Sequence, residues 1–364
     1  MTARVRTALI ASTLLLLCVA RSPLVASQTP GAFAETIAKL SGTGGYFDTD
    51  NLISNEGSYL DVIPALEASG ASGGAYIGVG PDQNFSYIAE VRPAIAFIVD
   101  VRRDNLLLHL FFKSLFTLAP TRVEYVSLLF GVSAPADPEA WRVAGVARLI
   151  DHVDGGRAAQ RREETVSARI EAALADSGVP LSDEDRSTIR RFHHTFVSRG
   201  LDLKFETFGR PPQFSYPTYR ELLAQADPLG RPRSFLSTEA RYEFVRRLQT
   251  TDRLIPVVGD LSGPTALPAI GRMMKERGDR ISAMYVSNVE FYLFRGDRFD
   301  AYIGNLSRVP HDSRSVLIRA IFGGYARRSG GIGYGSASAV QSVAELVDGY
   351  TVGRFRSYGE LVPR

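Results

Sequence analysis

The segment at residues 73–103 constrains the fold of this chain more than any other. It reads GGAYIGVGPDQNFSYIAEVRPAIAFIVDVRR. Two short apolar runs, 75–79 and 94–99, flank a stretch whose apolar residues recur with helical spacing. Continuous apolar runs, unlike alternating ones, are typical of parallel strands covered on both faces. The segment therefore predicts a strand, a glycine turn, a helix and a second, parallel strand.

Strand and helix patterns alternate again near the C-terminal end of the chain. Further strands are predicted at 254–258, 281–286 and 316–322. Between about residues 120 and 250 strand patterns are missing and helical patterns dominate. We therefore expect one domain over 28–364, a doubly wound α/β fold with a mostly parallel, Rossmann-like sheet and a mainly helical insertion at about 120–250. The last predicted elements are a helix at 337–347 and an edge strand at 350–355.

The first 27 residues have the three parts of an export signal. Arg4 and Arg6 precede a 12-residue apolar run, LIASTLLLLCVA, and small residues follow at 25–27. The run is shorter than a membrane-spanning helix requires. We expect a secretory signal or an N-terminal anchor, an exported protein in the periplasm or outside the cell, and membrane contact only through this segment. Cys18, the one cysteine, lies inside the run, which excludes disulfides and cysteine chemistry from the body of the protein.

Charge and histidine spacing exclude two further classes of function. The chain has 42 basic and 39 acidic residues, and three of the basic ones belong to residues 1–27, so the remainder is balanced. A balanced body argues against nucleic acid as a partner. His193 and His194 are adjacent on a predicted helix and point to different faces, so we expect no metal site. His109 lies on an apolar helix and is expected to be a core residue.

Glycines and acids at the predicted strand ends are the candidate binding residues. Gly78 and Gly80 lie at the strand–helix turn, where backbone N–H groups can approach a ligand. Asp100 follows Gly80 by twenty residues and ends the next strand, the distance at which an acid meets the ribose hydroxyls of a nucleoside. Asp260 ends the third strand, where an acid can accept from an adenine amino group. Together they predict a site for a small, nucleoside-type ligand at one sheet edge.

This layout resembles the class I S-adenosylmethionine-dependent methyltransferases over residues 51–104 and 254–322. The resemblance implies that Gly78 and Gly80 form the glycine turn of the cofactor site. It also implies a ribose-binding role for Asp100, an adenine-side role for Asp260 and S-adenosylmethionine as the cofactor. The chain also resembles an uncharacterised bacterial family that shares the stretches GVGPDQNFSYI, VVGDLSGP and YVSNVEFYLF. That second resemblance implies a shared site and names no reaction.

The chain departs from the methyltransferase pattern at the glycine turn. Tyr76 stands where the family usually has an acid, and Asp82 replaces its third glycine. Asp82 either repels a carboxylate or holds the cofactor's amine, so it remains a candidate contact. A nicotinamide oxidoreductase is disfavoured because its glycine pattern would need a glycine at Gln83.

Two further polar clusters are candidates for contact with a ligand. Ser287 and Asn288 fall where the resemblance implies substrate-proximal residues, and Asn288 and Glu290 are the candidates for catalysis. Capping of a helix by Ser287 or Asn288 is the alternative. Three polar residues precede the first strand: Asn51, Asn55 and Glu56. They either close over a ligand or, as we expect, form a solvated turn.

Two functions stay open on this evidence. The first is a methyltransferase-like enzyme of unknown acceptor. The second is an exported envelope protein that retains the fold but is non-catalytic or binds another ligand, because S-adenosylmethionine is a cytoplasmic cofactor. A pocket open to both Asp100 and Asp260 favours the first. A pocket plugged by Tyr76, Pro81 or Asp82 favours the second.

Overall fold

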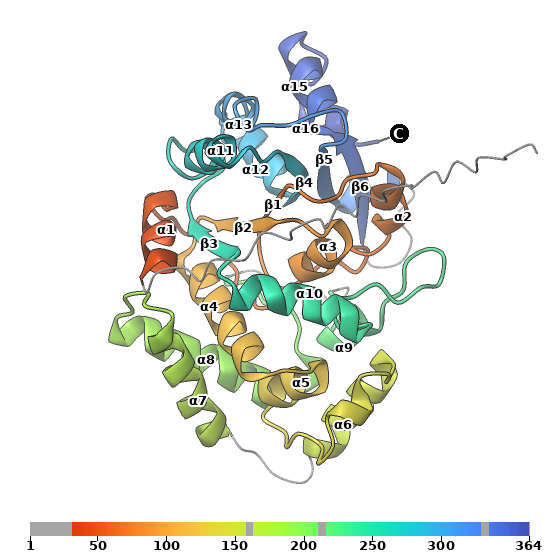
Figure 1. Ribbon diagram of the computed structural model, residues 1–364. Coiled ribbons are helices and arrows are strands. Elements are labelled where there is room, and N and C mark those ends of the chain that lie inside the picture. Colours follow the sequence, from red (N-terminus) through yellow and green to blue (C-terminus); the bar gives the residue numbers. More distant parts are fainter. Residues whose placement is uncertain (1–30, 158–162, 210–215, 329–334, 364) are drawn as a thin grey trace, which may run out of the picture.

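A computed structural model describes residues 31–157, 163–209, 216–328 and 335–363, so the predicted export segment lies outside the described residues. Its centre is a six-stranded sheet in the order β3-β2-β1-β4-β5-β6 (Figure 1). The strands are β1 (Ala75–Gly78), β2 (Ile95–Asp100), β3 (Leu254–Val258), β4 (Ile281–Ser287), β5 (Val316–Phe322) and β6 (Ser336–Ser342). β1 to β5 are parallel, and β6 is antiparallel to β5. The predicted α/β class with a mostly parallel sheet is confirmed.

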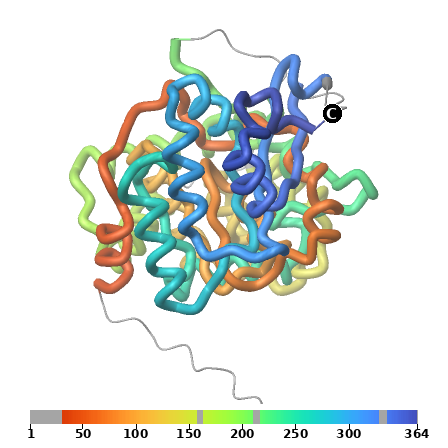
Figure 2. The backbone as a smooth tube through the Cα atoms, turned by 90° about the horizontal axis from the view of Figure 1, so that it is seen from above, coloured from red at the N-terminus to blue at the C-terminus, as the bar shows by residue number. Residues whose placement is uncertain are grey.

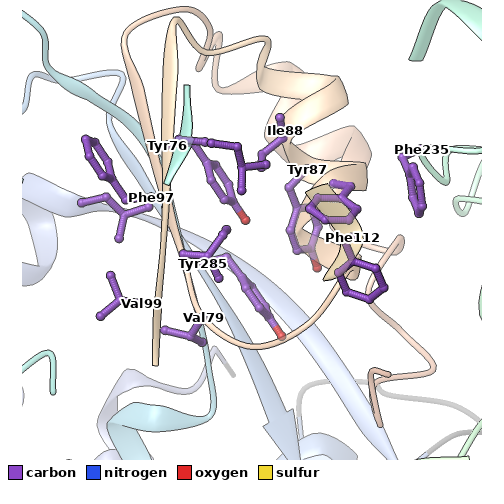
Figure 3. Close-up of a cluster of buried hydrophobic side chains, with 14 of the residues drawn as sticks. Tyr76, Val79, Tyr87, Ile88, Phe97, Val99, Phe112, Phe235 and Tyr285 are labelled. Carbon is purple, nitrogen blue, oxygen red and sulfur yellow. The ribbon is translucent and has the colours of Figure 1, made fainter. Parts of the chain in front are cut away.

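The central strands are buried because their residues are apolar on both faces. All side chains of β1 and β3 are buried, as are five of the six in β2. β1 lies between β2 and β4, with Ala75 opposite Ile95 on one side and Ile281 on the other. The core on the α3 side of the sheet combines aliphatic and aromatic side chains from strands and helices (Figure 3).

Helices lie on both sides of the sheet in Figure 1. On one side are α3 (Gln83–Val91), α4 (Arg103–Leu118) and α10 (Glu239–Thr250). On the other are α11 (Ala266–Arg277), α12 (Val289–Arg295) and α13 (Phe299–Leu306). Two shorter helices, α1 (Ala32–Leu40) and α2 (Ile63–Ala68), precede β1. None of the helices in the described ranges is long and apolar enough to cross a bilayer.

The chain between β2 and β3 forms the helical part of the molecule. After α4 it contains α5 (Arg122–Phe130), α6 (Val146–Arg157), α7 (Glu163–Asp176), α8 (Asp183–Arg199) and α9 (Tyr219–Ala224), and it ends with α10. α4 contacts β2 and β3 and also packs against α7 and α8, so it joins the sheet to these helices (Figure 1).

The C-terminal prediction is wrong for the strand at 350–355 and for the first half of the helix at 337–347. Residues 336–342 form the edge strand β6, so the predicted helix at 337–347 is helical only from 343, in α15 (Val343–Thr351). No strand forms at 350–355, where the first two residues end α15 and the next four lie in a turn and loop. Two short helices, α14 (Gly323–Arg328) and α16 (Tyr358–Leu361), complete this region. β6 reads SASAVQS, and five of its seven residues are partly exposed. As an antiparallel edge strand it does not need the continuous apolar run by which the parallel strands were predicted.

Candidate functional site

The glycine turn between β1 and α3 is filled by a side chain of its own helix. Asn84 Nδ2 donates to the carbonyls of Val79 (2.8 Å) and Pro81 (2.7 Å), and Tyr76 Oη donates to Asn84 Oδ1 (2.8 Å). A Cβ at Gly78 would lie 1.9 Å from Asn84 Oδ1. Gly78 is therefore needed so that Asn84 can enter the turn.

We expect Gly78→Ala to lower the free energy of unfolding by about 2–4 kcal/mol. The added methyl group must expel Asn84, which is held by three hydrogen bonds. Gly304→Ala is the matched control, because Gly304 lies within α13 and a Cβ there meets open space. Urea denaturation of both variants measures the effect. Equal unfolding curves for the two variants would contradict this account of the turn.

Three successive polar residues at the start of α3 each pair with a buried tyrosine. Besides the Asn84–Tyr76 pair, Tyr219 Oη donates to Asp82 Oδ2 (2.6 Å) and Gln83 Nε2 donates to Tyr285 Oη (2.5 Å). Figure 3 shows Tyr76 and Tyr285 side by side in the core. Burial raises the pKa of Asp82 to about 6. Asp82, a candidate cofactor contact in the sequence, is used here to join the turn to helix α9.

Asp100 ends β2 as predicted, and its carboxylate is bound by Arg102. The guanidinium donates to both carboxylate oxygens, at 3.2 Å from Nε and 3.0 Å from Nη2, and the Arg102 backbone N–H adds a third bond. Arg102 Nη1 also donates to the carbonyls of Thr49 (3.0 Å) and Asp50 (3.2 Å). Arg102 therefore links the acid expected to bind ribose to the segment that precedes β1.

That segment, residues 42–56, crosses the carboxyl ends of the strands, and we call it the strap. Gly42 N–H donates to the Val258 carbonyl (2.8 Å), and Gly45 N–H donates to that of Val101 (2.6 Å). Figure 2 shows the strap in red and orange, running along one side of the molecule away from α1. The expectation of a solvated turn at the end of the strap is wrong for Glu56, whose side chain is buried with 1% of its surface exposed. Asn51 and Asn55 are half-buried.

Glu56 is held at the junction of the strap with β4. Tyr285 Oη (2.5 Å) and Ser287 Oγ (2.6 Å) both donate to Glu56 Oε1. Ser287 adopts a left-handed backbone conformation, with φ 50°. Burial raises the pKa of Glu56 to about 7, although both hydrogen bonds oppose the shift. Sequence patterns gave no reason to expect this cluster, because Glu56 and Tyr285 are 229 residues apart.

The remaining candidates lie further along the sheet and have partners of their own. Asp260 follows β3, accepts from the Ser262 hydroxyl (2.7 Å) and forms an ion pair with Arg298 (2.5 Å). Asn288 is the N-cap residue of α12, without a side-chain capping bond. Glu290 forms a buried ion pair with Arg319 at 2.7 Å, both side chains being 1% exposed.

Several buried polar atoms in the segments around the glycine turn have no hydrogen-bond partner among the described residues. These atoms are Thr49 Oγ1, Glu56 Oε2, Gln83 Oε1, Asn105 Oδ1 and His109 Nδ1. They belong to the strap, the start of α3 and the first half of α4. Buried polar atoms are nearly always paired in native proteins, with protein, water or a ligand. Five of the thirteen such atoms in the described residues belong to the segments that meet at this sheet edge, and we take that edge as the candidate site.

His109 is a core residue, as predicted, and it also faces the turn. Its Nε2 lies 2.9 Å from the carbonyl oxygen of Gly80. A carbonyl only accepts, so His109 has its proton on Nε2, and Nδ1 remains an acceptor. Burial lowers the pKa of His109 to about 4, which keeps the ring neutral near pH 7.

A small cavity adjoins the turn on the α9 side. Its volume is about 10 Å³, which is about the room that one water needs. Polar lining residues include Asp82, Gln83 and Ser86. In the part of the chain that the structure describes, no group of three or more His, Cys, Asp or Glu side chains is placed to hold a metal.

Comparison with known proteins assigns a family and no activity. The family model described as "Domain of unknown function (DUF7790)" matches residues 52–134 and 161–348. The chain belongs to this DUF7790 family. No curated protein matches it. The matched ranges include the strap's end, the glycine turn and most of the helices between β2 and β3, so these helices are part of what the family shares.

Proposed function

We propose that this DUF7790 protein binds a small, nucleoside-type ligand at the carboxyl edge of β1 and β2, within a doubly wound, Rossmann-like and methyltransferase-like fold. The unpartnered acceptors carry this proposal. Neutral His109 Nδ1 and Asn105 Oδ1 need hydrogen-bond donors. A nucleoside supplies donors through its ribose hydroxyls and its exocyclic amine.

The strand order supports the same location. The order reverses between β1 and β4, since the chain runs outward from β1 to β3 on one side and from β4 to β5 on the other. Ligands of open α/β sheets bind outside the carboxyl ends of the strands at such a point. The glycine turn, the strap and Ser287 all belong to this edge.

S-adenosylmethionine is the first ligand to test, and methyl transfer is the activity it would imply. It carries hydroxyl and amine donors, the class of group that the unpartnered acceptors of His109 and Asn105 lack. When bound it would supply a methyl group. The residues of this chain would orient it from the Gly80 turn and exclude water beneath the strap. The methyl acceptor stays open.

A second candidate function follows from the two acids. The carboxylates of Asp100 and Asp260 are paired with Arg102 and Arg298. Tyr76 and Asn84 fill the turn on which the cofactor would pack. These contacts favour the alternative of an exported protein that keeps the fold and binds another donor-rich ligand without transferring a methyl group.

Thermal unfolding of the full chain with S-adenosylmethionine separates the two candidates. At about 100 times its Kd a ligand stabilises the folded state by roughly 2.7 kcal/mol. We expect a higher unfolding midpoint with wild type and a smaller rise with Asp100→Ala. Asp104→Ala is the control, since Asp104 is half exposed on the first turn of α4. An unchanged wild-type midpoint would reject S-adenosylmethionine and favour the second candidate.

A further inference from the structure

The cluster around Glu56 contains a carboxyl group with one oxygen unused. Glu56 Oε1 accepts from both Tyr285 and Ser287, whereas Oε2 is buried and has no partner among the described residues. Gln83, which donates to the same tyrosine hydroxyl, leaves its Oε1 unpartnered as well. The cluster lies where β4 adjoins β1, at the reversal of strand order.

Burial alone does not explain the unused oxygen, as a second glutamate demonstrates. Glu290 is as buried as Glu56, at 1% exposed. Both of its oxygens accept from Arg319, at 2.7 and 3.2 Å. No cation pairs with Glu56 among the residues that the structure describes. With Oε1 accepting both hydrogen bonds, a proton on Glu56 resides on Oε2. Protonated Oε2 is a donor without an acceptor, and ionised Oε2 is an acceptor without a donor.

We propose that Glu56 is the proton-exchanging residue of the ligand site, with Oε2 in contact with the bound molecule. This inference rests on the proposed binding of a small ligand at the same edge. In the exchange, an O–H or N–H bond of the ligand breaks and an Oε2–H bond forms, and the ligand atom keeps the electron pair. The reverse step returns the proton. Tyr285 and Ser287 hold Oε1 in both states.

The surroundings of Glu56 suit such an exchange near neutral pH. Four tyrosines of the described residues interact with Glu56 electrostatically: Tyr76 on β1, Tyr87 on α3, Tyr285 on β4 and Tyr358 on α16. Their hydroxyls are neutral, since burial raises the pKa of each. Burial also keeps the pKa of Glu56 at about 7, where proton gain and loss are both accessible. Ser287 is partly exposed, so the cluster lies one side chain from solvent.

Carboxyl labelling of the full-length protein tests the proposal. A water-soluble carbodiimide with glycine amide converts a carboxyl group into an amide whenever local opening exposes it, and peptide mass spectrometry locates the amide. Both glutamates are buried, so both need such an opening, but only that of Glu290 must also break an ion pair. Just below neutral pH we expect Glu56 to label roughly a hundred times faster than Glu290, whose release requires a buried ion pair to break. Glu290 is thus the internal control, the denatured protein verifies that both peptides are detected, and Glu56→Gln removes the signal.

The same labelling with S-adenosylmethionine separates this inference from the proposed ligand. We expect a saturating concentration to slow labelling of Glu56 roughly tenfold or more. Fast labelling that is not slowed, together with an unchanged unfolding midpoint, would support a Glu56 that is released by local opening without breaking an ion pair and would reject S-adenosylmethionine. Labelling of Glu56 no faster than that of Glu290 would overturn the inference. A raised midpoint without protection of Glu56 would overturn it too.

Discussion

Replacing Arg319 by methionine should lower the free energy of unfolding by about 3–5 kcal/mol. Arg319 and Glu290 are each 1% exposed, and the guanidinium donates to both carboxylate oxygens. Without it the Glu290 carboxylate is a buried charge with no cation. Chemical denaturation of wild type and variant measures the loss. Arg354→Met is the control, because Arg354 pairs with Glu345 at a site where its side chain is 61% exposed, and such pairs contribute about 1 kcal/mol or less.

A double replacement shows whether the loss comes from the stranded charge. Glu290→Leu with Arg319→Met removes both charges, and buried pairs replaced by apolar residues are often neutral in stability. We therefore expect the double variant to recover most of the loss. A double variant as unstable as Arg319→Met alone would indicate that the packing of Arg319, and not its charge, matters. Recovery would identify the Glu290–Arg319 pair as a structural link between α12 and β5.

The central strands could be predicted because their signals are local. The runs 75–79 and 94–99 are apolar without interruption, and a strand buried between two helical layers leaves that pattern in the sequence. β6 leaves no such pattern, because its residues are small or polar and its partner β5 supplies the hydrogen bonds. The strap also lacks a pattern. Its conformation depends on Arg102 and on the strand ends, which lie 50 or more residues away.

The sequence predicts where the acids of the candidate site lie along the chain, but not which side chains they contact. Asp82, Asp100 and Asp260 lie at strand–helix connections as the sequence predicts, since turn residues and acids follow the apolar runs directly. What each acid contacts depends on the fold. Tyr219 is 137 residues from Asp82, and Arg298 is 38 residues from Asp260. Arg102 is only two residues from Asp100, so of these three pairings it is the one that could have been predicted from the sequence.

The free energy of unfolding should depend on pH through Glu56. Its pKa rises from 4.5 to about 7 on folding, so the folded state binds this proton more tightly than the unfolded chain. The stabilisation is complete below pH 4.5 and is lost as the pH rises through about 7. Each pKa unit is worth about 1.4 kcal/mol, so the loss is on the order of 3 kcal/mol. Glu56→Gln should remove this dependence, because glutamine stays neutral.

The informative quantity is the difference between wild type and Glu56→Gln at each pH. Other groups titrate in both proteins, and the subtraction cancels them. Asp50 and Asp82, with pKa values raised to about 6, also stabilise the folded state more at low pH. His109, with its pKa lowered to about 4, stabilises it more at high pH. We expect the stability of wild type relative to the variant to fall between pH 5 and pH 8. Parallel denaturation profiles would mean that Glu56 does not titrate in this range. An acid–base role at neutral pH would then be excluded.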